Sequence, residues 1–277
     1  MATRVRTQVG ALIREWRQRR RLSQLELALD VGISARHLSF VETGRSRPSP
    51  ELVLALARRL QVPYRERNRM LLAAGYAPVY RERSLDDPEM GPVRQAVDRV
   101  LAGHEPYPAI AVDRAWNLVA ANAAVGPLLE GASAELLEPP VNVLRLSLHP
   151  DGLAPRIENL DEWSGHLLDR LGRQVALTGD DELAALYEEL SSYPGVSPAT
   201  GSAEEPTAAD EIVATLRLRT DAGTVALFST VTTFGTAVDI TTSELAIEAF
   251  FPADEATARV LGAGGKATVR PSAARGS

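Results

Sequence analysis

The chain has 277 residues, carries a formal net charge of -6 and contains no cysteine. The absence of cysteine excludes disulfides, thiol redox sensing and cysteine-ligated metal sites. The length allows two modest domains that each bury a core. No apolar run approaches the ~20 residues that span a bilayer, and the Arg-rich start lacks the apolar segment of a signal peptide. The composition therefore predicts a soluble, cytoplasmic protein without a membrane span.

Charge is distributed unevenly along the chain. Residues 1–83 hold 17 Arg against 7 Asp or Glu, a net charge of +10. Residues 84–277 hold 13 Lys or Arg against 29 Asp or Glu, a net charge of -16. A basic module beside an acidic one indicates that only the first binds a phosphate backbone.

Residues 22–50 have the pattern of two short helices joined by a tight turn. Ser23 fits the N-cap position of the first helix, and Glu26 lies at the spacing of a capping box. Gly32 can adopt the positive φ of a sharp turn, and Ser34 can cap a second helix that ends at Gly44. This pattern predicts a helix-turn-helix whose second helix enters a DNA major groove. An ordinary helical hairpin is the alternative, which the basic charge and the flanking helices disfavour.

Three further helices complete the basic segment. Residues 9–20 carry an apolar stripe at helical spacing. The sequence Ser-Pro-Glu at residues 49–51 begins a fourth helix with a cap and a proline at its first position, and a fifth ends at Gly75. We therefore expect a five-helix DNA-binding domain over residues 1–77 and a charged, turn-rich linker over residues 78–92.

The remaining residues alternate helical and strand-like segments. Residues 212–220 alternate apolar and polar side chains with the period of a half-buried strand, and residues 221–223 indicate a hairpin turn. An antiparallel sheet with helices on one face, the outline of a PAS-like α+β fold, is expected over residues 93–261, with a disordered tail at 262–277. The expected elements are helices at 93–101, 123–129, 161–176, 181–191 and 254–261, strands at 109–113, 116–121, 212–220, 224–234 and 245–251, and a mobile loop at 194–210.

The helix-turn-helix residues resemble a known DNA-binding family. Between Ser23 and Ser49 the chain has Ser-Gln, Ala, Gly-Ile-Ser, Leu-Ser, Glu-x-Gly and Pro-Ser at the intervals of phage-repressor-like (Xre/Cro-C1) regulators. The resemblance covers about residues 9–72. It implies that Arg17 and Glu42 form a partly buried ion pair, which locks the first helix against the third.

The same resemblance places the base-facing side chains on the second helix of the motif. Arg36 can donate two parallel hydrogen bonds to guanine, worth about 1–3 kcal/mol of discrimination. Phe40 either contacts a thymine methyl group or packs inward. Arg45 and Arg47 follow this helix and are expected to contact phosphate, with a solvated run of charge as the alternative. The expected DNA-binding residues are Gln24, Ser34, Ala35, Arg36, Ser39, Phe40, Thr43, Arg45 and Arg47.

A single module of this kind makes few contacts with DNA. Useful specificity is therefore expected from a homodimer on a palindromic operator, whose half-sites lie about 34–36 Å apart in the double-stranded DNA. The sequence shows no coiled coil, so the dimer contact must come from the second domain or from the DNA itself.

The second half of the chain resembles another family. Residues 109–124, 142–150 and 227–254 resemble the ligand-binding domain of MmyB-like transcription regulators. The resemblance covers about residues 93–261. It implies a small apolar ligand, such as a fatty acid, in a cavity between the sheet and the helices.

Apolar residues on elements that can face a shared cavity are the candidate ligand contacts, and an ordinary filled core is the alternative for each of them. The polar candidates are Asn122, Asn142, Arg145 and His149. The guanidinium of Arg145 suits an acyl carboxylate, and a salt bridge to a protein carboxylate is its alternative. The candidate ligand-binding residues are Trp116, Asn122, Leu144, Arg145, Leu146, Trp163, Leu167, Leu171, Phe228, Phe234 and Phe250.

Enzymatic function is not expected. The chain has no nucleophile elbow and no P-loop, and its four histidines are scattered without metal-ligand spacing, so we expect no cofactor and no metal. The leading interpretation is a sequence-specific transcription regulator that senses a small ligand. The alternative is a ligand-independent repressor or antitoxin-like regulator, whose second domain mediates only dimerisation or binding of a protein partner.

Overall fold

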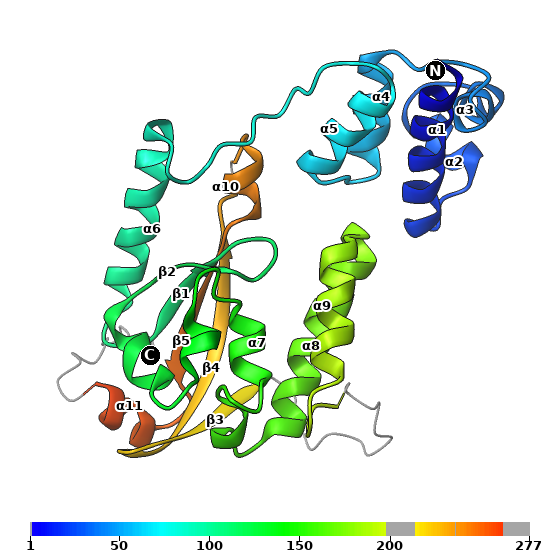
Figure 1. The fold of residues 1–277 in the computed structure, drawn as a ribbon. Helices are drawn as coiled ribbons and strands as arrows, with labels where there is room; N and C mark the ends of the chain where they lie inside the picture. Colours follow the sequence, from blue (N-terminus) through cyan, green and yellow to red (C-terminus); the bar gives the residue numbers. More distant parts are fainter. Residues whose placement is uncertain (1, 198–213, 236, 263–277) are drawn as a thin grey trace, which may run out of the picture. The chain divides into compact units, whose positions relative to one another are not determined.

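The computed structural model describes residues 2–197, 214–235 and 237–262 (Figure 1). The expected tail, beyond residue 262, and the expected loop, from residue 198 onward, lie outside the described residues. Two compact units are present. The first comprises residues 1–94, 169–189 and 233–245, and the second comprises residues 95–168, 190–232 and 246–277. The expected domain boundaries near residues 77, 92 and 261 remain a prediction.

Five helices form the N-terminal region, as the sequence predicts. They are α1 (Ala2–Arg19), α2 (Gln24–Asp30), α3 (Ala35–Glu42), α4 (Pro50–Arg59) and α5 (Tyr64–Ala73). Large side chains between them are fully buried, and these include Ile13, Leu27, Leu38, Leu56, Leu60, Met70 and Leu71. Burial of each such side chain contributes about 1.5–3 kcal/mol, so packing and not helix propensity stabilises these short helices.

The ends of these helices are closed by short side chains. The Ser23 hydroxyl accepts a hydrogen bond from the Glu26 amide, and the Glu26 carboxylate accepts one from the Ser23 amide at 2.7 Å, which completes the expected capping box. The hydrogen bond from the Ser23 amide, followed by the interaction with the Ser23 side chain, favours the charged carboxylate and lowers the pKa of Glu26. Ser34 caps α3 and Gly32 has a φ of 73° in the turn before it, as predicted. Ser49 caps α4, which begins with Pro50.

The second unit contains a five-stranded antiparallel sheet. Its strand order is β2-β1-β5-β4-β3, so the last strands of the chain pair with the first. A two-residue turn at residues 221–222 joins β3 to β4, with Thr220 paired to Gly223, as the hairpin signal predicts. The strands are β1 (Ala109–Val112), β2 (Leu118–Ala121), β3 (Thr215–Thr220), β4 (Gly223–Thr233) and β5 (Ala246–Pro252).

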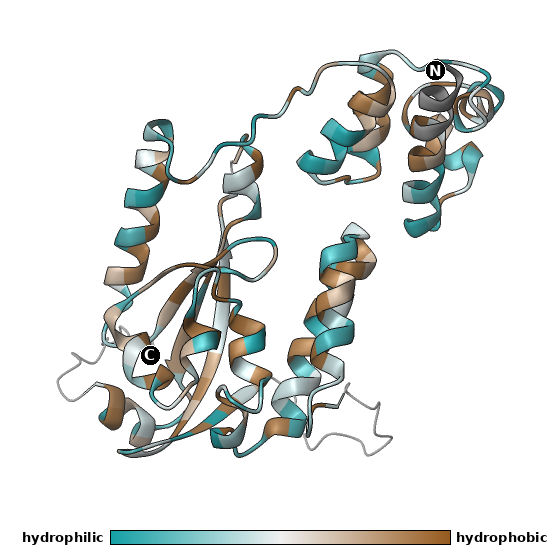
Figure 2. Ribbon diagram, in the orientation of Figure 1, coloured by the Kyte–Doolittle hydropathy of each residue, from teal (hydrophilic) through white to brown (hydrophobic). Residues whose placement is uncertain are grey.

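Helices precede, connect and follow these strands along the chain. They are α6 (Gly91–Gly103), α7 (Val143–Leu148), α8 (Leu160–Thr178), α9 (Asp181–Ser191), α10 (Ile240–Glu244) and α11 (Glu255–Leu261), with 3-10 turns η1 (Pro88–Met90), η2 (Ala123–Leu129), η3 (Ala134–Leu137) and η4 (Ala154–Arg156). In Figure 2 hydrophobic residues run along the central strands, whereas the start of α5 is hydrophilic. The fold is therefore an all-α helix-turn-helix region followed by an α+β domain, as predicted.

A 3-10 helix and two short α-helices are among the elements that differ from the expected ones. Residues 123–129 form a 3-10 helix and not an α-helix, because Pro127 lies inside the segment and supplies no amide hydrogen to an α-helical ladder. The helices α7 and α10 have no counterpart among the expected elements. Each is shorter than two turns, too short for its apolar spacing to reveal a period, and each begins at a side-chain cap, Asn142 or Asp239.

Candidate functional site

The base-facing candidates lie on one side of α3. Ala35, Arg36, Ser39 and Phe40 recur at the spacing that places side chains on one helical face. The Arg36 side chain is exposed, while Ala35, Ser39 and Phe40 are half-buried. The Thr43 hydroxyl donates to the carbonyl of Ser39 at 2.7 Å. The residues predicted to read bases thus form one continuous surface.

Phe40 lies beneath two guanidinium groups. The central carbon of Arg36 is 5.4 Å from the ring centroid, and that of Arg45 is 5.9 Å from it. Cations over an aromatic face are attracted by its quadrupole, which orients both side chains without consuming their hydrogen-bond donors. The half-buried ring therefore supports two cations at the edge of the recognition helix.

Glu42 joins the three first helices. Its carboxylate accepts two hydrogen bonds from Arg17, at 2.7 and 3.0 Å, and a third from the Gln24 amide at 2.7 Å. The expected ion pair is confirmed, and the hydrogen bond to Glu42 raises the pKa of Arg17. Gln24, expected at the phosphate backbone, also anchors this cluster. A side-chain amide has two N–H donors, so Gln24 keeps one for another acceptor.

The two arginines after α3 differ in their contacts. Arg45 is exposed, with its guanidinium over Phe40. Arg47 donates to the carbonyls of Ala74 and Gly75, at 2.9 and 3.2 Å, and lies 4.6 Å from the Tyr76 ring centroid. Arg47 therefore satisfies the terminal carbonyls of α5, a structural role that its position in a basic run does not reveal.

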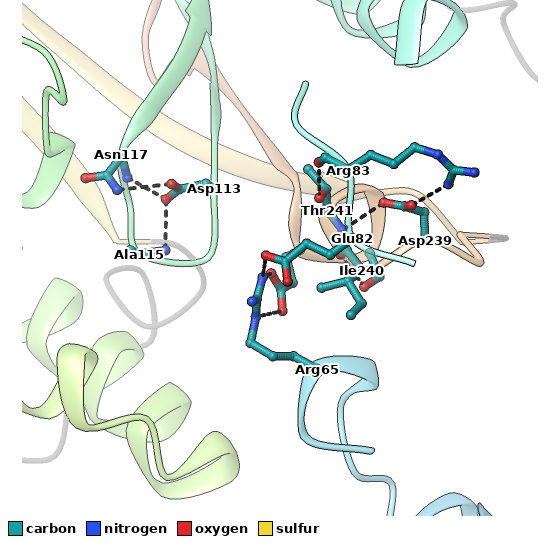
Figure 3. Close-up of polar contacts among 11 residues, drawn as sticks. Arg65, Glu82, Arg83, Asp113, Ala115, Asn117, Asp239, Ile240 and Thr241 are labelled. Atoms are coloured by element: carbon teal, nitrogen blue, oxygen red, sulfur yellow. Dashed lines mark hydrogen bonds and ion pairs between the residues drawn. The ribbon is translucent and has the colours of Figure 1, made fainter. Parts of the chain in front are cut away.

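A cluster of ion pairs joins α5, residues 80–83 and α10 within the first unit (Figure 3). Arg65 donates to both carboxylate oxygens of Glu244, at 3.0 and 2.9 Å, and contacts Glu82 at 2.6 Å. The hydrogen bonds from Arg65 to Glu244, foremost among its contacts, raise the pKa of Arg65. Sequence reasoning missed this cluster, since α10 is too short to be predicted.

The segment before α6 is bound to α10 by further hydrogen bonds. Arg83 contacts the Asp239 carboxylate at 2.7 Å, and the Thr241 hydroxyl donates to the Arg83 carbonyl at 2.6 Å. The Ile240 amide donates to the carbonyl of Arg81 at 2.8 Å. The expected linker is thus ordered by specific contacts, in spite of its turn-rich composition.

An apolar cavity of about 100 Å³ lies inside the second unit. Side chains from all five strands, from η2, from α7 and from the start of α8 surround it. Among the lining residues only Ser147 and Glu248 are polar. The lining residues are Pro108, Ile110, Leu118, Val125, Leu128, Leu129, Val143, Leu144, Leu146, Ser147, Leu153, Trp163, Leu167, Leu216, Leu218, Leu227, Glu248 and Phe250.

Five of the eleven candidate ligand contacts line this cavity: Leu144, Leu146, Trp163, Leu167 and Phe250. Asn122 instead serves the fold, since its amide group bonds the Ala109 amide and the carbonyls of Leu101 and Tyr107. Phe228 stacks on Phe251 at 5.4 Å. The remaining candidates, which are also absent from the lining, are Trp116, Arg145, Leu171 and Phe234.

Glu248 is the acidic lining residue, and sequence reasoning missed it. Its side chain is nearly buried, and one carboxylate oxygen accepts a hydrogen bond from the Ser229 hydroxyl at 2.7 Å. Ser147, the other polar lining residue, accepts one from the Trp163 indole at 3.1 Å. A lone acidic residue in the otherwise apolar strand of residues 245–251 was the available signal, because a charge in a strand interior requires partners.

Within the described residues, no helix combines the length and the apolar character that a membrane span requires. In the same part of the chain, no cluster of three or more His, Cys, Asp or Glu side chains is arranged to hold a metal ion.

Comparison with known proteins identifies both parts of the chain. Residues 13–67 match a helix-turn-helix family model, and residues 93–263 match the MmyB-like transcription regulator ligand binding domain. The crystal structure of the clp gene regulator ClgR from C. glutamicum is 28% identical over 26% of this chain and 88% of that one, with a TM-score of 0.23. No curated protein matches. Both matched families belong to transcription regulators and not to enzymes, and the second spans more than half of the sequence, so the chain belongs to the MmyB-like transcription regulators and combines a helix-turn-helix DNA-binding domain with a ligand-binding domain.

Proposed function

We propose that this transcription regulator senses a small apolar molecule in the cavity of its second unit and thereby changes its affinity for an operator. The cavity is the observation that carries this proposal. Its volume of about 100 Å³ far exceeds the roughly 10–15 Å³ that one water molecule needs. An empty apolar cavity forfeits packing energy, so an apolar molecule that fills it stabilises the folded state.

Two groups of residues on and beside α3 are proposed to bind double-stranded DNA. Arg36 reads guanine through its exposed guanidinium, with Ala35, Ser39 and Phe40 at the neighbouring bases. Contacts to the phosphate backbone come from the expected residues outside this base-reading group, namely Gln24, Ser34, Thr43, Arg45 and Arg47.

The operator is proposed to be palindromic and to bind a homodimer. One recognition helix covers only a few base pairs, so two copies on half-sites about 34–36 Å apart supply the specificity that a single module lacks. A regulator of this kind acts where the chromosome lies, which supports the expected cytoplasmic location.

Coupling between the two functions is proposed to run along the chain through α10. Glu248 lines the cavity on β5, and Glu244, four residues earlier, pairs with Arg65 of α5 in the DNA-binding region. A ligand alters DNA affinity only if it binds two arrangements of this segment unequally. Hydrogen exchange of the α5 amides should therefore change when the ligand is removed.

The experiment begins with native mass spectrometry and solvent extraction of the purified full-length chain, together with selection of its operator from random DNA. We expect a co-purifying small molecule, and we expect its removal to change the operator affinity. A ligand-free protein whose second domain merely dimerises, with an operator affinity that no apolar compound alters, would contradict ligand sensing and support a constitutive regulator.

Substitutions then separate base reading from phosphate binding. Arg36→Ala should lose about 1–3 kcal/mol of discrimination at one base position and leave the others unchanged. Arg45→Ala should weaken binding to every sequence and reduce the salt dependence by about one charge. Arg58→Ala, on the exposed side of α4, is the matched control for loss of one positive charge. If Arg36→Ala leaves the DNA footprint unchanged, Arg36 does not read bases.

A further inference from the structure

Phe40 lies on α3 at a position that core packing does not explain. Its ring is half-buried and, among the described residues, is not one of the apolar side chains packed against the core of the five-helix region. Phe40 follows Arg36 by about one helical turn, so the two side chains are neighbours on one face of α3. After α3 the chain turns back, because Gly44 has a φ of 73° and the Arg45 amide donates to the Phe40 carbonyl at 2.8 Å. Backbone geometry therefore brings two cations to the same ring.

The two guanidinium groups over this ring keep their hydrogen-bond donors. Within the described part of the chain, no carboxylate or carbonyl accepts a hydrogen bond from the side chain of Arg36 or Arg45. Arg47 and Arg59 instead donate to a backbone carbonyl and to a carboxylate. A guanidinium has five N–H donors in a planar fork, and attraction to an aromatic face uses none of them. The ring therefore orients each cation and leaves its donors for a base edge or a phosphate.

We infer that Phe40 is a positioning residue, whose ring holds Arg36 and Arg45 in the arrangement that DNA binding requires, and that the ring itself does not read a base. This inference rests on the proposed function, in which Arg36 reads guanine and Arg45 binds phosphate. Long arginine side chains lose conformational freedom when they bind, and a side chain that is held in place beforehand loses less. One aromatic residue thus contributes both to base discrimination and to phosphate binding.

The test removes the aromatic ring and keeps an apolar side chain. The full-length chain is titrated with the operator selected from random DNA and with operators that each differ from it at one base pair. Phe40→Leu should weaken binding to the selected operator about five- to thirtyfold, the loss of two cation–π contacts at an exposed surface. It should also reduce the preference at the base pair that Arg36→Ala affects. Phe40→Tyr retains the aromatic face and should bind within about twofold of the unmodified chain.

Combined substitutions show whether Phe40 acts through the two arginines. In a chain that already carries Arg36→Ala and Arg45→Ala, Phe40→Leu should cost no more than about twofold in affinity at the same low salt concentration, because the ring has no cation left to hold. Leu72→Ala truncates an exposed apolar side chain on α5 and is the matched control, which should change neither affinity nor base preference. Equal losses from Phe40→Leu with and without the two arginines overturn the inference. So does a lost preference at another base pair while the position read by Arg36 is unchanged.

The outcomes separate this inference from the function on which it rests. If the unmodified chain selects no operator, the proposed base and phosphate contacts fail together with the inference. If it binds an operator and Phe40→Leu leaves affinity and base preference unchanged, the inference alone fails. Nuclear magnetic resonance of the unmodified chain tests the ring contact even where Phe40→Leu does not fold. Ring current should move the δ-methylene protons of Arg36 and Arg45 upfield of those of Arg58 on α4, and unshifted resonances overturn the inference.

Discussion

The five-helix region and the sheet region differ in how completely their interiors are filled. In the first, large side chains such as Leu38 and Leu56 have no exposed surface and lie in one continuous core. In the second, an interior of similar composition surrounds a cavity of about 100 Å³. Close packing makes an interior resist change, so the five-helix region is held in one geometry, whereas the sheet region has room for an occupant.

The buried carboxylates of the two regions also differ in their roles. Glu42 receives three hydrogen bonds from Arg17 and Gln24, which lock helices together. Glu248 receives a hydrogen bond from Ser229 and lines the cavity. The first is a structural cross-link, and the second belongs to the surface that a ligand would contact.

Truncation of one leucine in each region should have the largest effect and tests the comparison directly. Leu38→Ala should cost about 4 kcal/mol of unfolding free energy, because a closed core leaves a new cavity. Leu216→Ala should cost about half as much, since its side chain already borders a void. Urea unfolding of the full chain, followed by circular dichroism and tryptophan fluorescence, measures both. Equal costs would mean that the cavity closes in solution.

Features that depend on residues close together in the sequence could be predicted in both regions. The capping box at Ser23, the positive φ of Gly32 and the start of α4 at Pro50 depend on neighbours within a few residues, so each could be predicted. The strands were also predictable, because Leu216 and Leu218 alternate with exposed arginines along β3.

Contacts between residues far apart in the chain could not be predicted in this way. Glu248 reaches the cavity only because β5 pairs with β1, more than a hundred residues earlier in the sequence. The capping role of Arg47 depends on the end of α5, and the pairing of Arg65 depends on the unpredicted helix α10. Similarly, the sequence predicts both Leu144 and Phe228 as ligand contacts, although of these two only Leu144 lines the cavity.

Two arginines that each bind a glutamate with two hydrogen bonds provide the next test. The Arg17 and Glu42 side chains are 11% and 2% exposed, and those of Arg65 and Glu244 are 32% and 18% exposed. Arg17→Ala leaves a buried carboxylate without its cation and should cost about 3 kcal/mol of unfolding free energy. Arg65→Ala should cost about 1 kcal/mol or less, because solvent screens the exposed pair. If the two substitutions cost comparable unfolding free energies, the pair of Arg65 and Glu244 lies in surroundings as rigid as those of Glu42.

The smallest expected effect concerns the capping box of α2. The pKa of Glu26 lies below its usual value near 4.5, because the carboxylate accepts the Ser23 amide hydrogen. A carboxyl group whose pKa is lower in the folded state stabilises the fold fully above its unfolded pKa, and this contribution disappears as the pH falls through the folded value. Glu26→Gln keeps an acceptor but loses the charge, so its unfolding midpoint should lie slightly below that of the unmodified chain at pH 7.

The two midpoints should converge below pH 4.5, whereas Glu188→Gln, whose carboxylate caps no helix in the described structure, should show no such convergence. If the difference between the two unfolding midpoints does not change with pH, the geometry of Glu26 and not its charge makes it a cap. Packing of the five-helix region would then stabilise the start of α2.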